Sequence, residues 1–163
     1  MKIVEIQGSQ SAISRSGSLL TLAQSWLHAV AIGSQLICVR DLPAHALLHA
    51  QFGHPLIRQA LAAVARAHVV LVATPIHKAA YSGLLKAFLD LLPNDALRGK
   101  TVLALATGGS TDQLLAVGCA FKPVLSALGA RAILDAVLTG ADAHAGWMAR
   151  NMAWRSVWAA KGL

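Results

Sequence analysis

Serine hydroxyls and one arginine crowd the segment 8–18, between an apolar run and a stretch with helical periodicity. A guanidinium and hydroxyl groups bind anions well, and the N–H groups that begin a helix add further donors for a negative group. Two glycines let the backbone come close to a ligand. The segment therefore predicts a cradle for a phosphate monoester, although serine-rich turns also serve only as helix caps. Its candidate ligands are Ser9, Ser14, Arg15, Ser16 and Ser18.

Two further loops follow apolar runs and carry few side chains that could act as acids or bases. In the loop Pro75–Gly83, we expect backbone groups to hydrogen-bond a flat heterocycle while His77 or Tyr81 lies against it. In the loop 107–110, Thr-Gly-Gly-Ser is small enough to admit a planar ring. A flavin fits this pattern, because it carries out hydride chemistry itself and needs only position, electrostatics and access from the protein.

Several other kinds of site are disfavoured by the sequence. The first loop has neither Gly-x-Gly-x-x-Gly nor Gly-Lys-Ser/Thr, so a dinucleotide-type turn and a P-loop are not expected. His45 and His49 stand four residues apart without a nearby carboxylate or cysteine, which argues against a metal. Cys38 and Cys119 provide no disulfide framework.

Apolar β-runs alternate with helical stripes along most of the chain. The expected strands cover residues 2–6, 36–39, 68–72, 101–105 and 131–138, and the expected helices cover 19–30, 57–64, 82–92 and 112–128, with a loop at 41–55. Ser82 is expected to cap a helix that Pro93 ends. Strands that are apolar on both faces predict a parallel sheet covered by helices on both sides. The fold class is α/β, as a flavodoxin-like three-layer sandwich with five strands in the order 2-1-3-4-5.

Composition limits the protein's class. With 163 residues, 56% hydrophobic and 13% charged, we expect a single domain over residues 1–163. No apolar stretch is long enough to span a bilayer, and the first residues read as a strand, so a cytoplasmic protein is expected. The net charge of +7 is scattered along the chain, which favours phosphorylated small molecules over nucleic acid.

The chain resembles the NADPH-dependent FMN reductase family, most closely the flavin reductase component of bacterial two-component alkanesulfonate monooxygenase systems. The resemblance covers about residues 1–140 and rests on motifs at 8–9, 14–20, 73–86, 89–93, 105–109, 114–117 and 122–128. It implies that the phosphate of FMN is held by Ser9, Arg15, Ser16 and Ser18. It further implies that the ribityl chain and ring lie against Pro75, Ile76, His77 and Lys78, supported by Ser82 and Gly83, and that the isoalloxazine contacts Thr107, Gly108 and Gly109.

The resemblance also implies an activity and partners. The expected reaction is reduction of FMN by NADPH, or by NADH, in a homodimer or homotetramer that supplies reduced flavin to a monooxygenase of sulfonate or sulfur assimilation. Neither a nucleic acid nor a membrane is an expected partner. An FMN-bound quinone, azo or metal-ion reductase and a flavodoxin-type electron carrier are the alternatives. A carrier is usually acidic, whereas this sequence has a pI near 10.1.

Two positions, His77 and Cys119, and the C-terminal segment depart from the family. His77 stands where many relatives have tyrosine, and Cys119 stands where the subgroup has an aromatic residue within an inserted π-turn. The sequence therefore does not predict that turn or the subgroup's tetramer, and a relative without efficient turnover is a further alternative. Pro123 is expected to kink the surrounding helix. Residues 141–163 match the family poorly and are expected to form a divergent helix bearing Trp147, Trp154 and Trp158.

Overall fold

A parallel sheet forms the centre of the molecule. The computed structural model describes residues 1–29, 32–108, 115 and 117–139. The sheet is ordered β2-β1-β3-β5-β6, with β4 paired only to β3. This confirms the predicted flavodoxin-like order, with one extra strand. The strands are β1 (Ile3–Gln7), β2 (Ser34–Cys38), β3 (Val69–His77), β4 (Ala80–Tyr81), β5 (Thr101–Gly108) and β6 (Ala132–Thr139).

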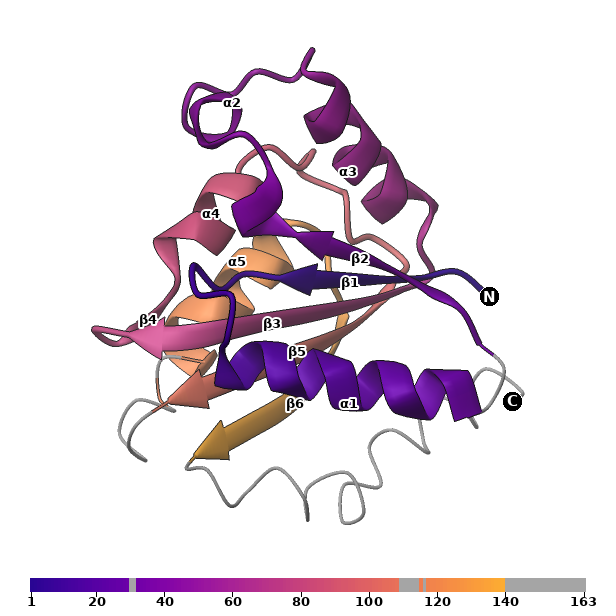
Figure 1. Cartoon of the computed structure of the whole chain (residues 1–163), viewed down its shortest axis with the longest axis vertical. Coiled ribbons are helices and arrows are strands. Elements are labelled where there is room, and N and C mark those ends of the chain that lie inside the picture. The colour runs from indigo at the N-terminus through magenta and orange to yellow at the C-terminus, as the bar shows by residue number, and fades with distance from the viewer. Residues whose placement is uncertain (30–31, 109–114, 116, 140–163) are drawn as a thin grey trace.

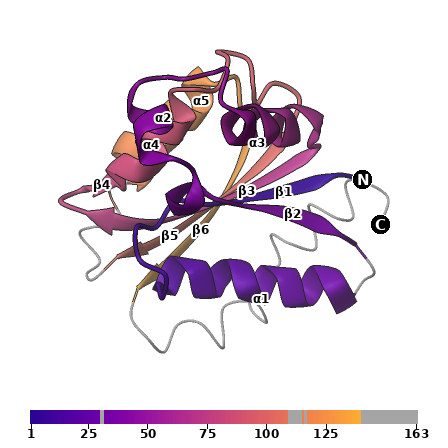
Figure 2. The same ribbon diagram turned by 45° about the horizontal axis from the view of Figure 1, so that its top comes forward.

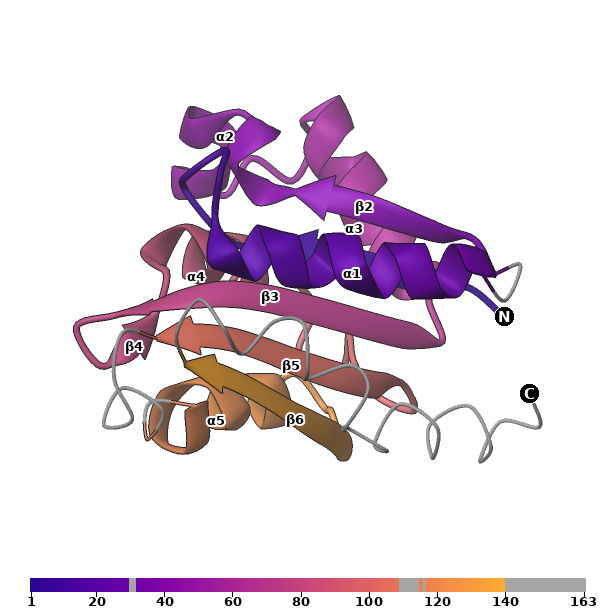
Figure 3. The same cartoon turned by 60° about the horizontal axis from the view of Figure 1, so that its bottom comes forward.

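Helices cover the two faces of the sheet and give three layers (Figure 2). One face carries α1 (Arg15–Ala29), and the other carries α2 (Ala44–Leu48), α3 (Pro55–Arg66), α4 (Gly83–Leu89) and α5 (Lys122–Ala127). Because the strands are parallel, their carboxyl ends meet at one edge, where α1 begins (Figure 3).

The apolar core has two parts because successive strand residues point to opposite faces. In β3, Val69, Leu71 and Ala73 pack with Leu19, Ala23 and Leu27 of α1, among others. Val70 and Val72 point the other way and pack with residues of α3, α4 and α5. The near-continuous apolar runs thus bury both faces of the strands.

The third strand is longer than predicted. It was expected to end at residue 72, but β3 continues through Pro75 to His77 and turns into β4. Ala73 accepts a hydrogen bond from Gly8 N on the β1 side of the strand. Because successive residues alternate sides, the nitrogen of Pro75 faces the same side beyond the end of β1, and no sheet hydrogen bond is lost. The proline therefore does not end the strand.

Other predicted boundaries were also wrong. Strand β5 continues to Gly108, so Thr107 and Gly108 belong to the strand and not to the loop expected there, and α1 begins at Arg15 instead of residue 19. The segment 41–55 is not all loop, because it contains α2 and follows a 3₁₀ turn at Val39–Asp41. Ala46 and Leu47 of α2 are buried, so tertiary packing stabilises a helix too short to be recognised from periodicity. Helix α4 does begin at the predicted Ser82 cap, but it ends at Leu89, before Pro93.

A π-helix precedes α5. It covers Val117–Phe121, the segment that in the resembling subgroup carries a π-turn, which the sequence alone did not predict here because of Cys119. Val117 and Phe121 at its two ends are buried, while Cys119 is exposed, so packing of the flanking residues does not require an aromatic ring at Cys119. Pro123 lies in the first turn of α5, directly after the π-helix, so its missing N–H falls where the helical hydrogen-bond pattern changes. The predicted start of this helix at residue 112 and the predicted helix at 141–163 lie outside the described residues.

Candidate functional site

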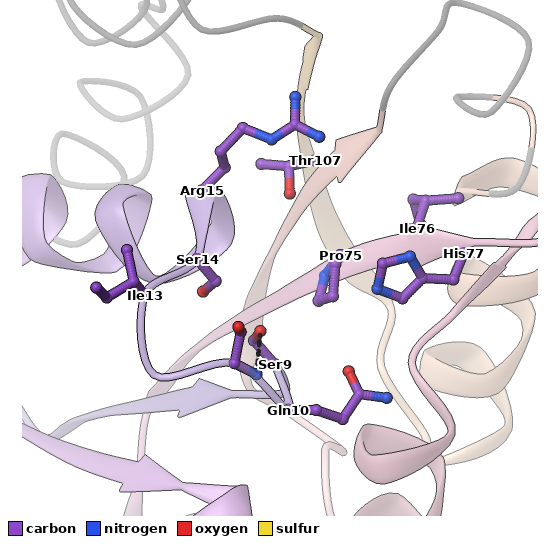
Figure 4. A pocket seen from close by; sticks show the side chains of 10 residues that line it. Ser9, Gln10, Ile13, Ser14, Arg15, Pro75, Ile76, His77 and Thr107 are labelled. Atoms are coloured by element: carbon purple, nitrogen blue, oxygen red, sulfur yellow. Dashed lines mark hydrogen bonds between the residues drawn. The ribbon is translucent and has the colours of Figure 1, made fainter.

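A cleft of about 670 Å³ opens at the carboxyl edge of the sheet, between the loop after β1 and the extension of β3 (Figure 4). Its volume lies within the usual range for small-molecule sites, about 300 to 1,000 Å³. The residues that line it are Ser9, Gln10, Ser11, Ile13, Ser14, Arg15, Pro75, Ile76, His77 and Thr107.

One wall is built around the first turn of α1. Ser14 caps this helix, because its Oγ accepts a hydrogen bond of 3.0 Å from Gly17 N. The helix thus presents its remaining first-turn N–H groups, which have no acceptor within the helix, next to the Arg15 guanidinium. A Cβ at Gly17 would lie 2.5 Å from Gln7 Nε2 and 2.9 Å from Ser14 Oγ, so a side chain there would require the Gln7 amide and the capping hydroxyl to move. This wall suits an anion with several oxygens.

The opposite wall is the extension of β3 together with the end of β5. Pro75 pairs with Thr107 across the parallel ladder, and Ile76 and His77 continue along the wall. Thr107 is only 4% exposed and offers little bulk to the cleft. Figure 4 shows Pro75, Ile76 and His77 on the side of the cleft away from Ser14 and Arg15. The wall combines backbone groups, small side chains and one imidazole, which suits a planar heterocycle.

The structure brings together six of the predicted site residues, which line one cleft from three strand ends. These are Ser9, Arg15, Pro75, Ile76, His77 and Thr107. Ser14, which the sequence offered as a hydroxyl donor for a phosphate, lines the cleft with them, and so do three residues of the first loop that the sequence did not single out: Gln10, Ser11 and Ile13. Their position in the same serine-rich loop could have identified them as residues of the site.

Other predicted residues lie around the cleft without lining it. Ser16 is buried, with its Oγ 3.4 Å from Ser14 Oγ. Ser18 is exposed on α1 and donates to Ser14 O over 3.2 Å. Lys78 lies at the tip of the β3–β4 hairpin.

Of the last predicted residues, two lie at the start of a helix and one lies at the end of a strand. Ser82 and Gly83 begin α4, behind the wall formed by β3. Gly108 ends β5. Gly109 lies outside the described residues.

The charge of the cleft is positive. Among the described residues that line it, Arg15 carries the positive charge and none is acidic. The described ion pairs lie elsewhere, between Arg40 and Asp41, Lys86 and Asp90, and Arg98 and Asp95. An anion in this cleft would therefore meet no carboxylate from the described part of the wall.

Two other features are absent from the described part of the chain. No group of three histidine, cysteine or acidic side chains gathers there in a way that could hold a metal. His45 instead contacts Gln51, with 2.7 Å between their Nε2 atoms. Among the described helices, none has both the length and the hydropathy needed to cross a bilayer.

Comparison with known proteins agrees with this geometry. Residues 1–144 match the family described as NADPH-dependent FMN reductase. The chain belongs to the NADPH-dependent FMN reductase family. Membership places it among the oxidoreductases, with NADPH-dependent reduction of FMN as its class of reaction.

Individual relatives support this membership. The chain is 47% identical to an FMN reductase (NADPH) of Pseudomonas putida, over 84% of this chain and 70% of that protein. It is 44% identical to an FMN reductase (NADPH) of Escherichia coli, over 84% of this chain and 72% of that protein. The crystal structure of the NADH:FMN oxidoreductase EMOB in its apo form superposes with a TM-score of 0.80 at 40% identity, covering 85% of this chain and 75% of that one.

Proposed function

We propose that the cleft at the carboxyl edge of the sheet binds FMN and that the protein uses NADPH to reduce it. The observation that supports this most directly is the pairing of an anion-binding helix start with a wall of backbone and small side chains in one cleft. Related proteins of this family carry the same reaction in their names.

The donors present fit the two ends of FMN. The phosphate would be held by the first turn of α1, the hydroxyls of Ser9 and Ser14, and the Arg15 guanidinium. The ring system would lie along Pro75, Ile76 and His77, with Thr107 at its edge. When bound, FMN supplies the hydride acceptor. The protein's own contribution is to orient the ring, to neutralise the phosphate and to leave one ring face open for the nicotinamide.

The positive side chains near the cleft and the name of a related structure indicate which coenzymes to test. Arg15 and Lys78 offer positive charge to the 2′-phosphate of NADPH, and NADH is the second candidate because the EMOB structure is named for it. We further propose that the protein works as a homodimer or homotetramer and hands reduced FMN to a flavin-dependent monooxygenase of sulfonate or sulfur assimilation.

The test begins with the wild-type protein. FMN titration followed by flavin fluorescence should saturate, and NADPH oxidation should require added FMN and exceed the free-flavin background. Saturable FMN binding without turnover would instead favour an electron carrier. No saturation with FMN would contradict the proposal.

The Arg15→Ala variant tests the phosphate wall. Loss of a hydrogen bond to a charged group costs about 1.5 to 3 kcal/mol, and because Arg15 is exposed we expect the lower figure, which is about a tenfold higher Kd for FMN. Arg40→Ala is the matched control, since Arg40 pairs with Asp41 and does not line the cleft. Equal FMN affinity in the Arg15→Ala variant and the wild type would remove Arg15 from the site.

A further inference from the structure

Two hydroxyl side chains, Thr74 and Ser82, lie buried directly behind the cleft. Thr74 is 0% exposed and Ser82 is 2% exposed, and neither lines the cleft. Thr74 precedes Pro75 in β3, and Ser82 is the cap residue of α4. Both side chains can therefore influence the cleft only through the backbone that forms its walls.

Thr74 and Ser82 are joined by a hydrogen bond from the Ser82 backbone, and each hydroxyl makes a further bond toward one wall of the cleft. Ser82 N donates to Thr74 Oγ1 over 3.1 Å, and Thr74 Oγ1 donates to Pro75 O over 3.1 Å. In the other direction, Ser82 Oγ donates to Gly8 O and accepts from Leu85 N over 3.0 Å. Each hydroxyl thus both donates and accepts, so both are satisfied although they are buried.

Each of these further bonds ends on the backbone of one wall of the cleft. Pro75 belongs to the wall proposed to hold the flavin ring, and Gly8 immediately precedes Ser9 in the wall proposed to hold the phosphate. Gly8 is held on its other side as well, because its N–H donates to Ala73 O over 2.7 Å. It also packs closely on α4, since a Cβ at Gly8 would lie 2.7 Å from Leu85 Cβ.

We propose that Thr74 and Ser82 are positioning residues that set the spacing between the phosphate wall and the ring wall. This inference rests on the proposed function of the cleft. A ligand that spans both walls, as FMN does, gains from a fixed spacing because the protein has already lost the freedom that binding would otherwise remove. Riboflavin lacks the phosphate, engages one wall, and is far less sensitive to the spacing.

The experiment compares FMN and riboflavin affinities by fluorescence titration in five proteins. The wild type is compared with Thr74→Val and Ser82→Ala, which remove one hydroxyl each, and with Thr74→Ser and Ser82→Thr, which keep it. We expect each hydroxyl deletion to raise the Kd for FMN about tenfold and to change the Kd for riboflavin less than about twofold. The two conservative variants should restore the preference for FMN.

A destabilised control separates positioning from general loss of stability. Lys100 lies far from the cleft in the fold and its Nζ donates to Ala65 O and Ala67 O, at the end of α3. Lys100→Met should lower the melting temperature and leave the ratio of FMN to riboflavin affinities unchanged. All titrations are made below the lowest melting temperature, and Thr74→Val keeps the test open if Ser82→Ala, which also loses the α4 cap, does not fold.

The outcomes distinguish the two proposals. A wild type that prefers FMN, with the same preference in both hydroxyl deletions, overturns the positioning role and leaves the proposed function standing. The same is true if Lys100→Met loses the preference to the same extent as the deletions. A wild type that binds neither flavin overturns both proposals.

Discussion

At the scale of single residues, Glu5 is an acidic side chain buried against the apolar core. It is 0% exposed, on the same face of β1 as the core residue Ile3. Ser34 donates a hydrogen bond to its Oε1, while its Oε2 has no hydrogen-bond partner among the described residues. Burial raises the pKa of the Glu5 carboxyl, and hydrogen bonds from Ser34 and Gln24 and the charge of His28 oppose that shift only in part.

The raised pKa of Glu5 makes stability depend on pH in a definite direction. Because the folded protein binds this proton more tightly than the unfolded chain, the contribution of Glu5 is fully present below its unfolded pKa and is lost as pH rises through its folded pKa. Glu5→Gln removes the buried charge. We expect its free energy of unfolding to exceed that of the wild type by about 1 to 2 kcal/mol near pH 8, and the two to converge near pH 4.

Urea unfolding at several pH values measures this difference. Asp95→Asn is the control, because the Asp95 side chain is 62% exposed and its exposed pair with Arg98 should contribute less than about 1 kcal/mol at any pH. A Glu5→Gln variant that is less stable than the wild type across the whole range would show that the ionised carboxyl is favourable where it lies.

At the scale of elements, the β3–β4 hairpin is closed by two residues with unfavourable backbone angles. Lys78 has φ of 51° and Ala79 has φ of 59°, between the paired residues His77 and Ala80. Two central residues with positive φ are typical of a type I′ turn, which matches the twist of paired strands but prefers asparagine or glycine. The hairpin carries His77 into the cleft, so the strain lies beside the candidate site.

Glycine at the second turn position should relieve this strain. We expect Ala79→Gly to raise the free energy of unfolding by about 1 kcal/mol, because glycine adopts positive φ without a Cβ clash. Ala80→Gly, one residue later in β4, should instead lower it by about 0.5 to 1 kcal/mol. Thermal unfolding of the two variants side by side makes the comparison, and loss of stability in both would contradict the assigned turn.

At the scale of the whole molecule, positive charge should govern how the coenzyme arrives. The chain has a net charge of +7, and the described residues lining the cleft include Arg15 and no acid. Such a field raises the local concentration of anions and is screened by salt. NADPH carries a 2′-phosphate that NADH lacks. We expect KM for NADPH to rise several-fold between about 20 and 200 mM salt, and KM for NADH to rise less.

Steady-state assays with both coenzymes at fixed FMN check this expectation. If KM for NADPH and KM for NADH rise equally with salt, the 2′-phosphate has no significant electrostatic interaction with the protein. In that case Arg15 and Lys78 would not explain a preference for NADPH.

The alternation of apolar runs and helical stripes was enough to predict the sheet order, because strands buried on both faces admit few architectures. The same loops pointed to the cleft, since strand ends of a parallel sheet converge at one edge. Ser9, Arg15, Pro75, His77 and Thr107 could therefore be placed in one site from the sequence, and the structure brings them together.

Tertiary structure decided what local patterns could not. Pro75 reads as a strand terminator, but it lies beyond the end of β1, where a missing donor has no partner to lose, so β3 continues to His77. The resemblance gives Ser82 a supporting place behind the ring-lining residues, but its contacts with Thr74 and Gly8 arise from residues far apart in sequence. Sequence determines which residues can bind and which faces are buried, because these depend on side-chain chemistry and local periodicity. Which of them touch a ligand and which support it depends on packing between segments, which no local pattern contains.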